Sequence, residues 1–228
     1  MKHSLLLTSS LTLIAASGLA QAAAAPASAF TTTGNLSFTS DYVFRGITQN
    51  GGKTALQGGF DVSHTDGLSA GVWASNVNWT NTTLEVDAYA AYGFSLTKDI
   101  AASVGYIGYI YEGNSSLNTS ELNVSATAYG LTAKISYATT AYFGIAGAGT
   151  KYYELNYAYD IAAVKGLSLA LHYGLTYGKS TSSNDKDYSI ALSYPVLGFT
   201  GTLAYSNGSG SYAGTYEGIT AVSLKKTF

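Results

Sequence analysis

The sequence predicts an all-β fold, namely a transmembrane antiparallel up-and-down β-barrel of about twelve strands. Three observations predict it. About twelve stretches alternate between apolar and polar residues, which is the period of a strand with two different faces. The chain begins with an export signal, and its last alternating stretch, 216–228, ends on the aromatic residue Phe228. Exported chains built from such strands are typical of bacterial outer-membrane barrels.

The first 22 residues have the features of a signal peptide. Lys2 and His3 form a short basic start, an apolar stretch follows at 5–16, and Ala-Gln-Ala at 20–22 is a cleavage site. A second small-residue site at 27–29 would place cleavage after residue 29 instead. The apolar stretch is shorter than the roughly 20 residues that a membrane-spanning helix needs, although a retained anchor is the alternative. We therefore expect a signal peptide over 1–22 and one barrel domain over 30–228.

The composition favours a membrane barrel over a soluble enzyme. Only 11% of the residues are charged, against about 25% in an ordinary soluble domain, and the chain has 20 Tyr, 26 Gly and 2 Pro. Tyrosine suits the membrane–water interfaces, because one end of its ring is apolar and the other is polar. No Cys is present, which excludes disulfides, thiolate metal sites and Cys nucleophiles. Removing Lys2 leaves ten basic and 13 acidic residues, a balance that argues against nucleic acid as a partner.

Each strand is predicted from its own period-two alternation. In chain order, the predicted strands cover residues 34–46, 54–64, 68–79, 83–95, 100–112, 119–129, 131–140, 150–162, 166–178, 186–194, 198–207 and 216–228. Short turns alternate with mostly longer, more polar loops, which is the asymmetry of periplasmic turns and external loops in these barrels. An even number of strands places both termini on the periplasmic side. The alternative, a soluble β-sandwich, requires an inner apolar face sealed against a second sheet.

Parity then assigns a lipid face and a lumen face to every strand. In the stretch 34–46, one face carries four apolar residues, Leu36, Phe38, Tyr42 and Phe44. We expect the apolar faces to contact lipid, because Arg or Lys there costs about 2–4 kcal/mol near the membrane midplane. The pore-lining set predicted by parity is Asp41, Arg45, Asp61, Glu85, Asp87, Glu121, Lys134, Glu154, Asp160, His172, Glu217 and Lys225.

The predicted lumen is acidic, since its carboxylates outnumber its cations by more than two to one. Carboxylates that line a water-filled pore attract cations and repel anions. This predicts a narrow, weakly cation-selective channel for passive diffusion of small polar solutes or ions. The alternative is a plugged barrel braced by salt bridges among the same residues, with a structural or adhesive role through its external loops. Twelve strands lie between eight, which enclose only side chains, and 16–18, which leave an open channel.

Other chemistry has little support in the sequence. A barrel phospholipase needs a lipid-facing Ser and His, but parity turns His172 inward and no specific Ser motif accompanies it. His64 beside Asp66 provides too few ligands for a metal site. We expect no enzyme activity and no cofactor.

The expected partners are outer-membrane lipid, the barrel-insertion machinery that reads Phe228 as an assembly signal, the permeating solutes and, as an open question, further copies of the chain. The apolar loop 142–149 either folds inward as a constriction or extends its strands.

Four segments carry a family resemblance. They are residues 39–49 (TSDYVFRGITQ), 57–61 (QGGFD), 73–77 (WASNV) and 223–228 (SLKKTF). They resemble the TorF-family porins, a proteobacterial family formerly filed as conserved hypothetical proteins. The resemblance covers essentially the whole mature chain, and SDYVFRG at 40–46 is its most specific part. It implies an outer-membrane barrel of the porin type, but no substrate and no catalytic residue. One departure is Lys226, at a position where barrels often have an aromatic or apolar residue.

Overall fold

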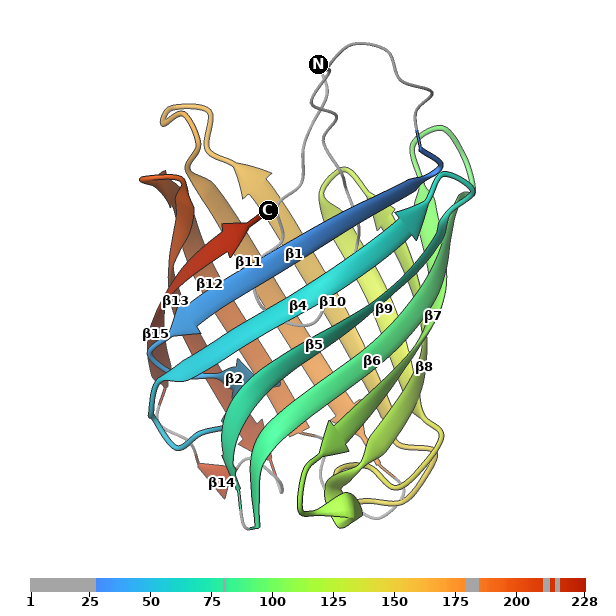
Figure 1. Cartoon of the computed structure of the whole chain (residues 1–228), viewed down its shortest axis with the longest axis vertical. Helices are drawn as coiled ribbons and strands as arrows, with labels where there is room; N and C mark the ends of the chain where they lie inside the picture. Colours follow the sequence, from blue (N-terminus) through green and yellow to red (C-terminus); the bar gives the residue numbers. More distant parts are fainter. Residues whose placement is uncertain (1–27, 80, 179–184, 211–213, 216–217) are drawn as a thin grey trace.

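The computed structural model describes residues 28–79, 81–178, 185–210, 214–215 and 218–228. Within them, twelve strands form the wall of a closed antiparallel barrel (Figure 1), which confirms the predicted fold. They are β1 (Phe30–Thr39), β4 (Ala55–His64), β5 (Leu68–Trp79), β6 (Thr82–Ser95), β7 (Ala101–Tyr111), β8 (Thr119–Ala128), β9 (Leu131–Ala138), β10 (Lys151–Asp160), β11 (Ser168–Tyr177), β12 (Asp185–Val196), β13 (Phe199–Gly210) and β15 (Ile219–Thr227).

The barrel closes because the first and last wall strands pair with each other. β1 pairs with β4 on one side and with β15 on the other, and β15 pairs in turn with β13. Two short strands, β2 (Val43–Phe44) and β3 (Ile47–Thr48), form a separate small sheet, while β14 (Gly214–Thr215) pairs with the end of β13. One 3-10 turn, η1 (Ser115–Leu117), lies between β7 and β8. No helix of the described residues is long and apolar enough to cross a membrane.

Tight turns join the strands at one end of the barrel. Between β8 and β9 the connection is only Tyr129 and Gly130, with φ of 51° and 84°. Positive φ at both central residues is the type I′ geometry that matches the twist of the two strands, and Gly adopts it without steric cost. Figure 1 shows that β1 begins and β15 ends at one end of the barrel, whereas β2 and β14 lie at the other. The longer connections belong to this second end.

The two faces of the wall differ as parity predicts. Large apolar side chains are exposed on the outside, for example Leu36, Phe38, Val72, Val124, Leu155 and Leu203. Small polar and charged side chains are buried inside, for example Ser75, Asp87, Thr132, Ser136 and Asn156. This distribution is the reverse of a soluble protein, in which a large exposed apolar surface is rare.

The predicted strand 34–46 is wrong beyond Thr39, where β1 ends. Residues 40–54, which we call the inner hairpin, leave the wall and fold into the lumen, with β2 and β3 as their two arms. Tyr42, predicted to face lipid, is buried inside the barrel at 7% exposure, and Phe44 packs beside it. The alternation of residues continues through this segment, but the backbone reverses at Arg45 and Gly46, so parity with the wall is lost.

Three predictions concern residues outside this description. The signal peptide over 1–22, with its alternative cleavage after residue 29, lies largely outside the described residues and stays a prediction. The same holds for Glu217 as a pore-lining residue. The strand predicted over 216–228 is seen from Ile219.

Candidate functional site

The inner hairpin crosses the lumen at the end of the barrel that carries the long loops. Its turn consists of Arg45 and Gly46, with φ of 48° and 76°, between the paired residues Phe44 and Ile47. A Cβ atom at Gly46 would lie 2.9 Å from the Cβ of Asp187 on β12, and equally close to the backbone of β13. Only Gly fits this close approach. The tip of the hairpin therefore packs against β12 and β13, which lie beyond β15 from its attachment at β1.

Arg45 fastens the tip of the hairpin to the barrel. Its Nη1 and Nη2 atoms donate hydrogen bonds of 2.8 Å to the two carboxylate oxygens of Glu121 on β8, and Nη1 donates a third, also of 2.8 Å, to the hydroxyl of Tyr142. The side chains of Arg45 and Glu121 are 9% and 2% exposed. Burial lowers the pKa of Arg45, but Glu121 outweighs it and the pKa lies well above its ordinary value. The guanidinium therefore stays charged in the lumen.

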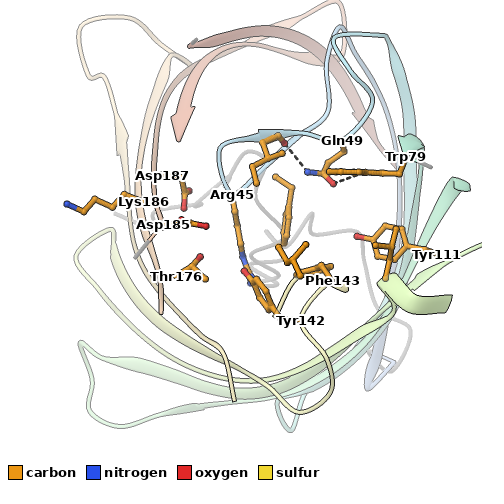
Figure 2. A pocket seen from close by; sticks show the side chains of 14 residues that line it. Arg45, Gln49, Trp79, Tyr111, Tyr142, Phe143, Thr176, Asp185, Lys186 and Asp187 are labelled. Atoms are coloured by element: carbon orange, nitrogen blue, oxygen red, sulfur yellow. Dashed lines mark hydrogen bonds between the residues drawn. The ribbon is translucent and has the colours of Figure 1, made fainter. Parts of the chain in front are cut away.

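The base of the hairpin is fastened by polar contacts. Within the hairpin, Thr48 donates a 2.7 Å hydrogen bond to Asp41. Burial raises the pKa of Asp41, and the hydrogen bond from Thr48 opposes that shift. Towards the wall, Tyr42 donates to Glu85 over 3.3 Å, and Nε1 of Trp79 donates to the side-chain oxygen of Gln49 over 3.2 Å (Figure 2). These contacts hold both arms of the hairpin inside the barrel.

A second loop also enters the lumen. Tyr142, in the connection between β9 and β10, is 5% exposed, and the ring of Phe143 lies 5.7 Å from that of Phe44 and 5.1 Å from that of Tyr109. Figure 2 shows Tyr142, Phe143 and Arg45 together inside the ring of strands. Of the apolar loop 142–149, Tyr142 and Phe143 fold inward, whereas Gly144, Ile145, Gly147 and Ala148 are exposed; that the loop forms a constriction stays a prediction.

A cavity of about 130 Å³ lies where the hairpin, this second loop and the wall meet. Aromatic and charged groups line it together, among them Phe44, Arg45, Tyr142, Phe143, Asp185 and Asp187. Lys186 points away from the lumen, as Figure 2 shows, so its charge does not offset the two neighbouring carboxylates inside.

The buried carboxylates of the wall differ in how they are compensated. Glu154 on β10 pairs with Lys134 at 2.9 Å, and Asp187 accepts hydrogen bonds from Tyr152 and from His172. Asp87 on β6 is fully buried and has no cationic partner among the described residues. Its neighbour Glu85, two residues earlier on the same face, is 1% exposed, and no described cation pairs with either of them. Two neighbouring carboxyl groups without a cationic partner among the described residues thus lie on the inner face of β6.

The structure places the described members of the predicted pore-lining set in four different surroundings. Asp41 and Arg45 lie on the inner hairpin instead of on the predicted strand. Asp160 is exposed at the end of β10. The wall residues that meet partners inside the barrel, or are buried there, are Asp61, Glu85, Asp87, Glu121, Lys134, Glu154 and His172. Lys225 lies opposite Ser37 across the closure of the barrel. That these residues line a conducting path stays a prediction.

Sequence reasoning missed several interior residues. Asp187 lies on the predicted strand 186–194 with the same parity as Ser189 and Ser193, so applying parity to that strand would have found it. Tyr109, Tyr111 and Tyr152 are buried inside, although tyrosines were predicted for the membrane interfaces. Tyr142 lies on a loop, where alternation gives no signal.

Comparisons with known proteins agree with the barrel. The model of a family described as bacterial protein of unknown function (Gcw_chp) matches residues 23–197. Among solved structures, the KdgM porin is similar with a TM-score of 0.59 and 12% identity over 86% of this chain and 98% of that chain. The NanC porin follows with a TM-score of 0.54 and 12% identity, with the same coverage. A KdgM structure in complex with disordered oligogalacturonate has a TM-score of 0.56 and 10% identity over 87% of this chain and 98% of that chain. Curated proteins give no significant match.

Proposed function

We propose that this chain, which belongs to the bacterial family of unknown function Gcw_chp, is an outer-membrane channel for passive diffusion of small polar solutes or ions. The observation that carries the proposal is the inverted barrel, with exposed Leu, Val and Phe outside and charged side chains inside. An apolar outer surface is what a barrel needs in a bilayer, and a polar interior is what it needs to pass polar solutes. No chemical step is required, so the chain acts without enzyme activity.

Export and assembly belong to the same proposal. The signal peptide directs the chain out of the cytoplasm, and Phe228 serves the insertion machinery as an assembly signal. The outward apolar residues contact lipid or a further copy of the chain. The resemblance of SDYVFRG at 40–46 to the TorF-family porins supports the porin assignment.

The charge of the lumen supports a preference for cations. Glu85 and Asp87 have no cationic partner among the described residues, whereas Arg45 and Lys134 are each paired with a carboxylate. A negative field in a narrow passage raises the local concentration of cations. One structure of the similar KdgM porin is a complex with disordered oligogalacturonate. An acidic lumen such as this one favours solutes of the opposite charge.

The inner hairpin supports a second candidate, a plugged barrel with a structural or adhesive role. It crosses the lumen and is held by a buried, bidentate ion pair. Under the first candidate, the hairpin is a constriction that leaves a narrow path or moves aside. Under the second, it closes the barrel permanently, and the outer loops carry the function.

Planar-bilayer conductance of the refolded mature protein under a KCl gradient tests the proposal. We expect steady unit steps of current and a reversal potential that favours K⁺. A reversal potential that favours Cl⁻ would contradict the cation preference, but it would still support the proposed channel. Silence from a protein that is folded and inserted would contradict the channel and favour the plugged barrel.

A further inference from the structure

We propose that Glu121 and the rings of Tyr142, Phe143 and Tyr152 form a binding site for guanidinium-type organic cations, which Arg45 of the inner hairpin occupies. The proposal rests on the proposed channel function in one respect, because it names a class of solute for that lumen. The site itself follows from contacts of the described residues and can be tested without measuring ion flow.

The acidic half of the site is shaped for a planar fork of donors. Both oxygens of Glu121 accept hydrogen bonds of 2.8 Å, one from each terminal nitrogen of Arg45, and the carboxylate is buried. Such a bidentate arrangement is specific for guanidinium, because an ammonium group is a point charge without the parallel donors. The Tyr142 hydroxyl accepts one further hydrogen bond from the same guanidinium, also of 2.8 Å.

The aromatic half of the site surrounds the same cation. The Cζ atom of Arg45 lies 3.9 Å from the ring centroid of Tyr152, 5.6 Å from that of Tyr142 and 6.0 Å from that of Phe143, and the ring of Phe44 on the hairpin itself lies at 4.8 Å. Aromatic faces within about 6 Å attract a cation through their quadrupoles, and the attraction is larger where water is excluded. All four site residues belong to the wall or to the second loop. The guanidinium and one further ring, that of Phe44, come from the hairpin, while the four site residues do not.

Two observations indicate that the occupant can be exchanged. The Nε atom of Arg45 is buried and has no hydrogen-bond partner among the described residues, so the guanidinium is not fully satisfied. The cavity of about 130 Å³ is bordered by Arg45, Tyr142 and Phe143, and it has room for several water-sized groups. It is also bordered by the carboxylates of Asp185 and Asp187, which favour the approach of a cation. A solute with a guanidinium group would compete with Arg45 and thereby loosen the tip of the hairpin.

The test measures binding of methylguanidinium to the refolded mature protein in detergent by isothermal titration calorimetry. Arg45→Ala removes the occupant, and its far-ultraviolet circular dichroism reports whether the barrel has formed. We expect saturable binding to R45A, and at least about tenfold weaker binding to the double variant R45A/E121Q, since the bidentate carboxylate is then lost. Methylammonium has the charge without the fork and urea has the fork without the charge, so both should bind at least about tenfold more weakly than methylguanidinium.

Two further proteins, the wild type and the variant Arg45→Lys, test the proposal if R45A does not fold. The wild type should bind methylguanidinium at least about tenfold more weakly than an unoccupied site, because Arg45 competes. Arg45→Lys keeps a cation on the hairpin but not the fork, so R45K should bind more tightly than the wild type. Equal binding to folded R45K and wild type, no saturable binding to folded R45A, or binding that survives E121Q would each overturn the proposal.

Binding and conduction separate the two proposals. If methylguanidinium binds to R45A but the inserted protein shows no conductance in the bilayer, the guanidinium site is supported and the channel is contradicted. If the protein conducts ions but R45A does not bind methylguanidinium, the channel is supported and the guanidinium site is overturned.

Discussion

Arg45 and Glu121 are separated by 76 positions in the sequence, yet the guanidinium of one and the carboxylate of the other meet in two hydrogen bonds of 2.8 Å inside the barrel. Arg45 is on the inner hairpin and Glu121 is on the wall strand β8. Their contact therefore determines how far the hairpin extends across the lumen. The SDYVFRG segment at 40–46 is the arm and turn that make this contact.

Breaking the Arg45–Glu121 pair should loosen the hairpin. Because both side chains are buried, Arg45→Ala leaves a carboxylate without its partner and should lower the free energy of unfolding by about 3–5 kcal/mol. Urea unfolding in detergent measures this change. Lys98→Ala is the matched control, because the Lys98–Asp99 pair is exposed and its loss should cost about 0–1 kcal/mol. Equal effects of the two substitutions would contradict the role of Arg45.

Gly46 should be needed for two reasons, namely its positive φ and the close packing of its backbone against β12 and β13. Gly46 and Gly52 both have positive φ, at 76° and 72°, but of the two only Gly46 lies against the wall, at β12 and β13. Gly52→Ala should cost about 1–2 kcal/mol from backbone strain alone. Gly46→Ala should cost more in urea unfolding and should also increase the unit conductance, because its Cβ would meet β12 and β13. If the two variants behave alike, the hairpin tip does not pack as described.

The unpaired carboxylate of Asp87 should be a cost to folding. Asp87→Asn replaces a buried carboxyl group that has no cationic partner among the described residues, and should raise the free energy of unfolding by about 1–3 kcal/mol. It should also shift the reversal potential away from cations if β6 borders the path. Glu154→Gln is the opposite case, because it breaks the 2.9 Å pair with Lys134 and should destabilise by about 3–5 kcal/mol. Destabilisation by both substitutions would contradict the difference between these carboxylates.

A charge on the outer face should be costly only at membrane depth. Val124, in the middle of β8, is 58% exposed on the outside of the barrel. Val124→Arg should lower stability in lipid vesicles by about 2–4 kcal/mol, while Leu197→Arg, in the turn between β12 and β13, should cost about 0–1 kcal/mol. If Val124→Arg has no effect in vesicles, this face does not contact hydrocarbon.

The last residue should matter for assembly. Phe228 closes the barrel seam through two backbone hydrogen bonds with Gly34, of 2.7 Å and 2.9 Å, and its ring lies over that glycine. Deletion of Phe228 should reduce the fraction of heat-modifiable, folded barrel in the outer membrane. Phe228→Tyr keeps the ring and the backbone and serves as the control. Normal assembly of the deletion would contradict Phe228 as an assembly signal.

Much of the wall could be predicted from the sequence because a strand exposes alternate residues to two different solvents. In β5 the predicted bounds match the observed ones, Leu68–Trp79, and most other strands differ by one to three residues. The set of inward residues on these strands follows from the same parity. The prediction failed at Tyr42 and Phe44, where alternation continues but the chain has left the wall.

By itself, the sequence determined the closed barrel, its apolar outside and its charged inside, since these depend on local periodicity and on the cost of burying charge in lipid. Only the tertiary structure decided what fills the lumen. The contact of Arg45 with Glu121 and Tyr142 joins a hairpin, a strand and a loop that are distant in the chain. Local alternation has no information about such contacts, because they depend on where the closed wall brings its opposite sides together.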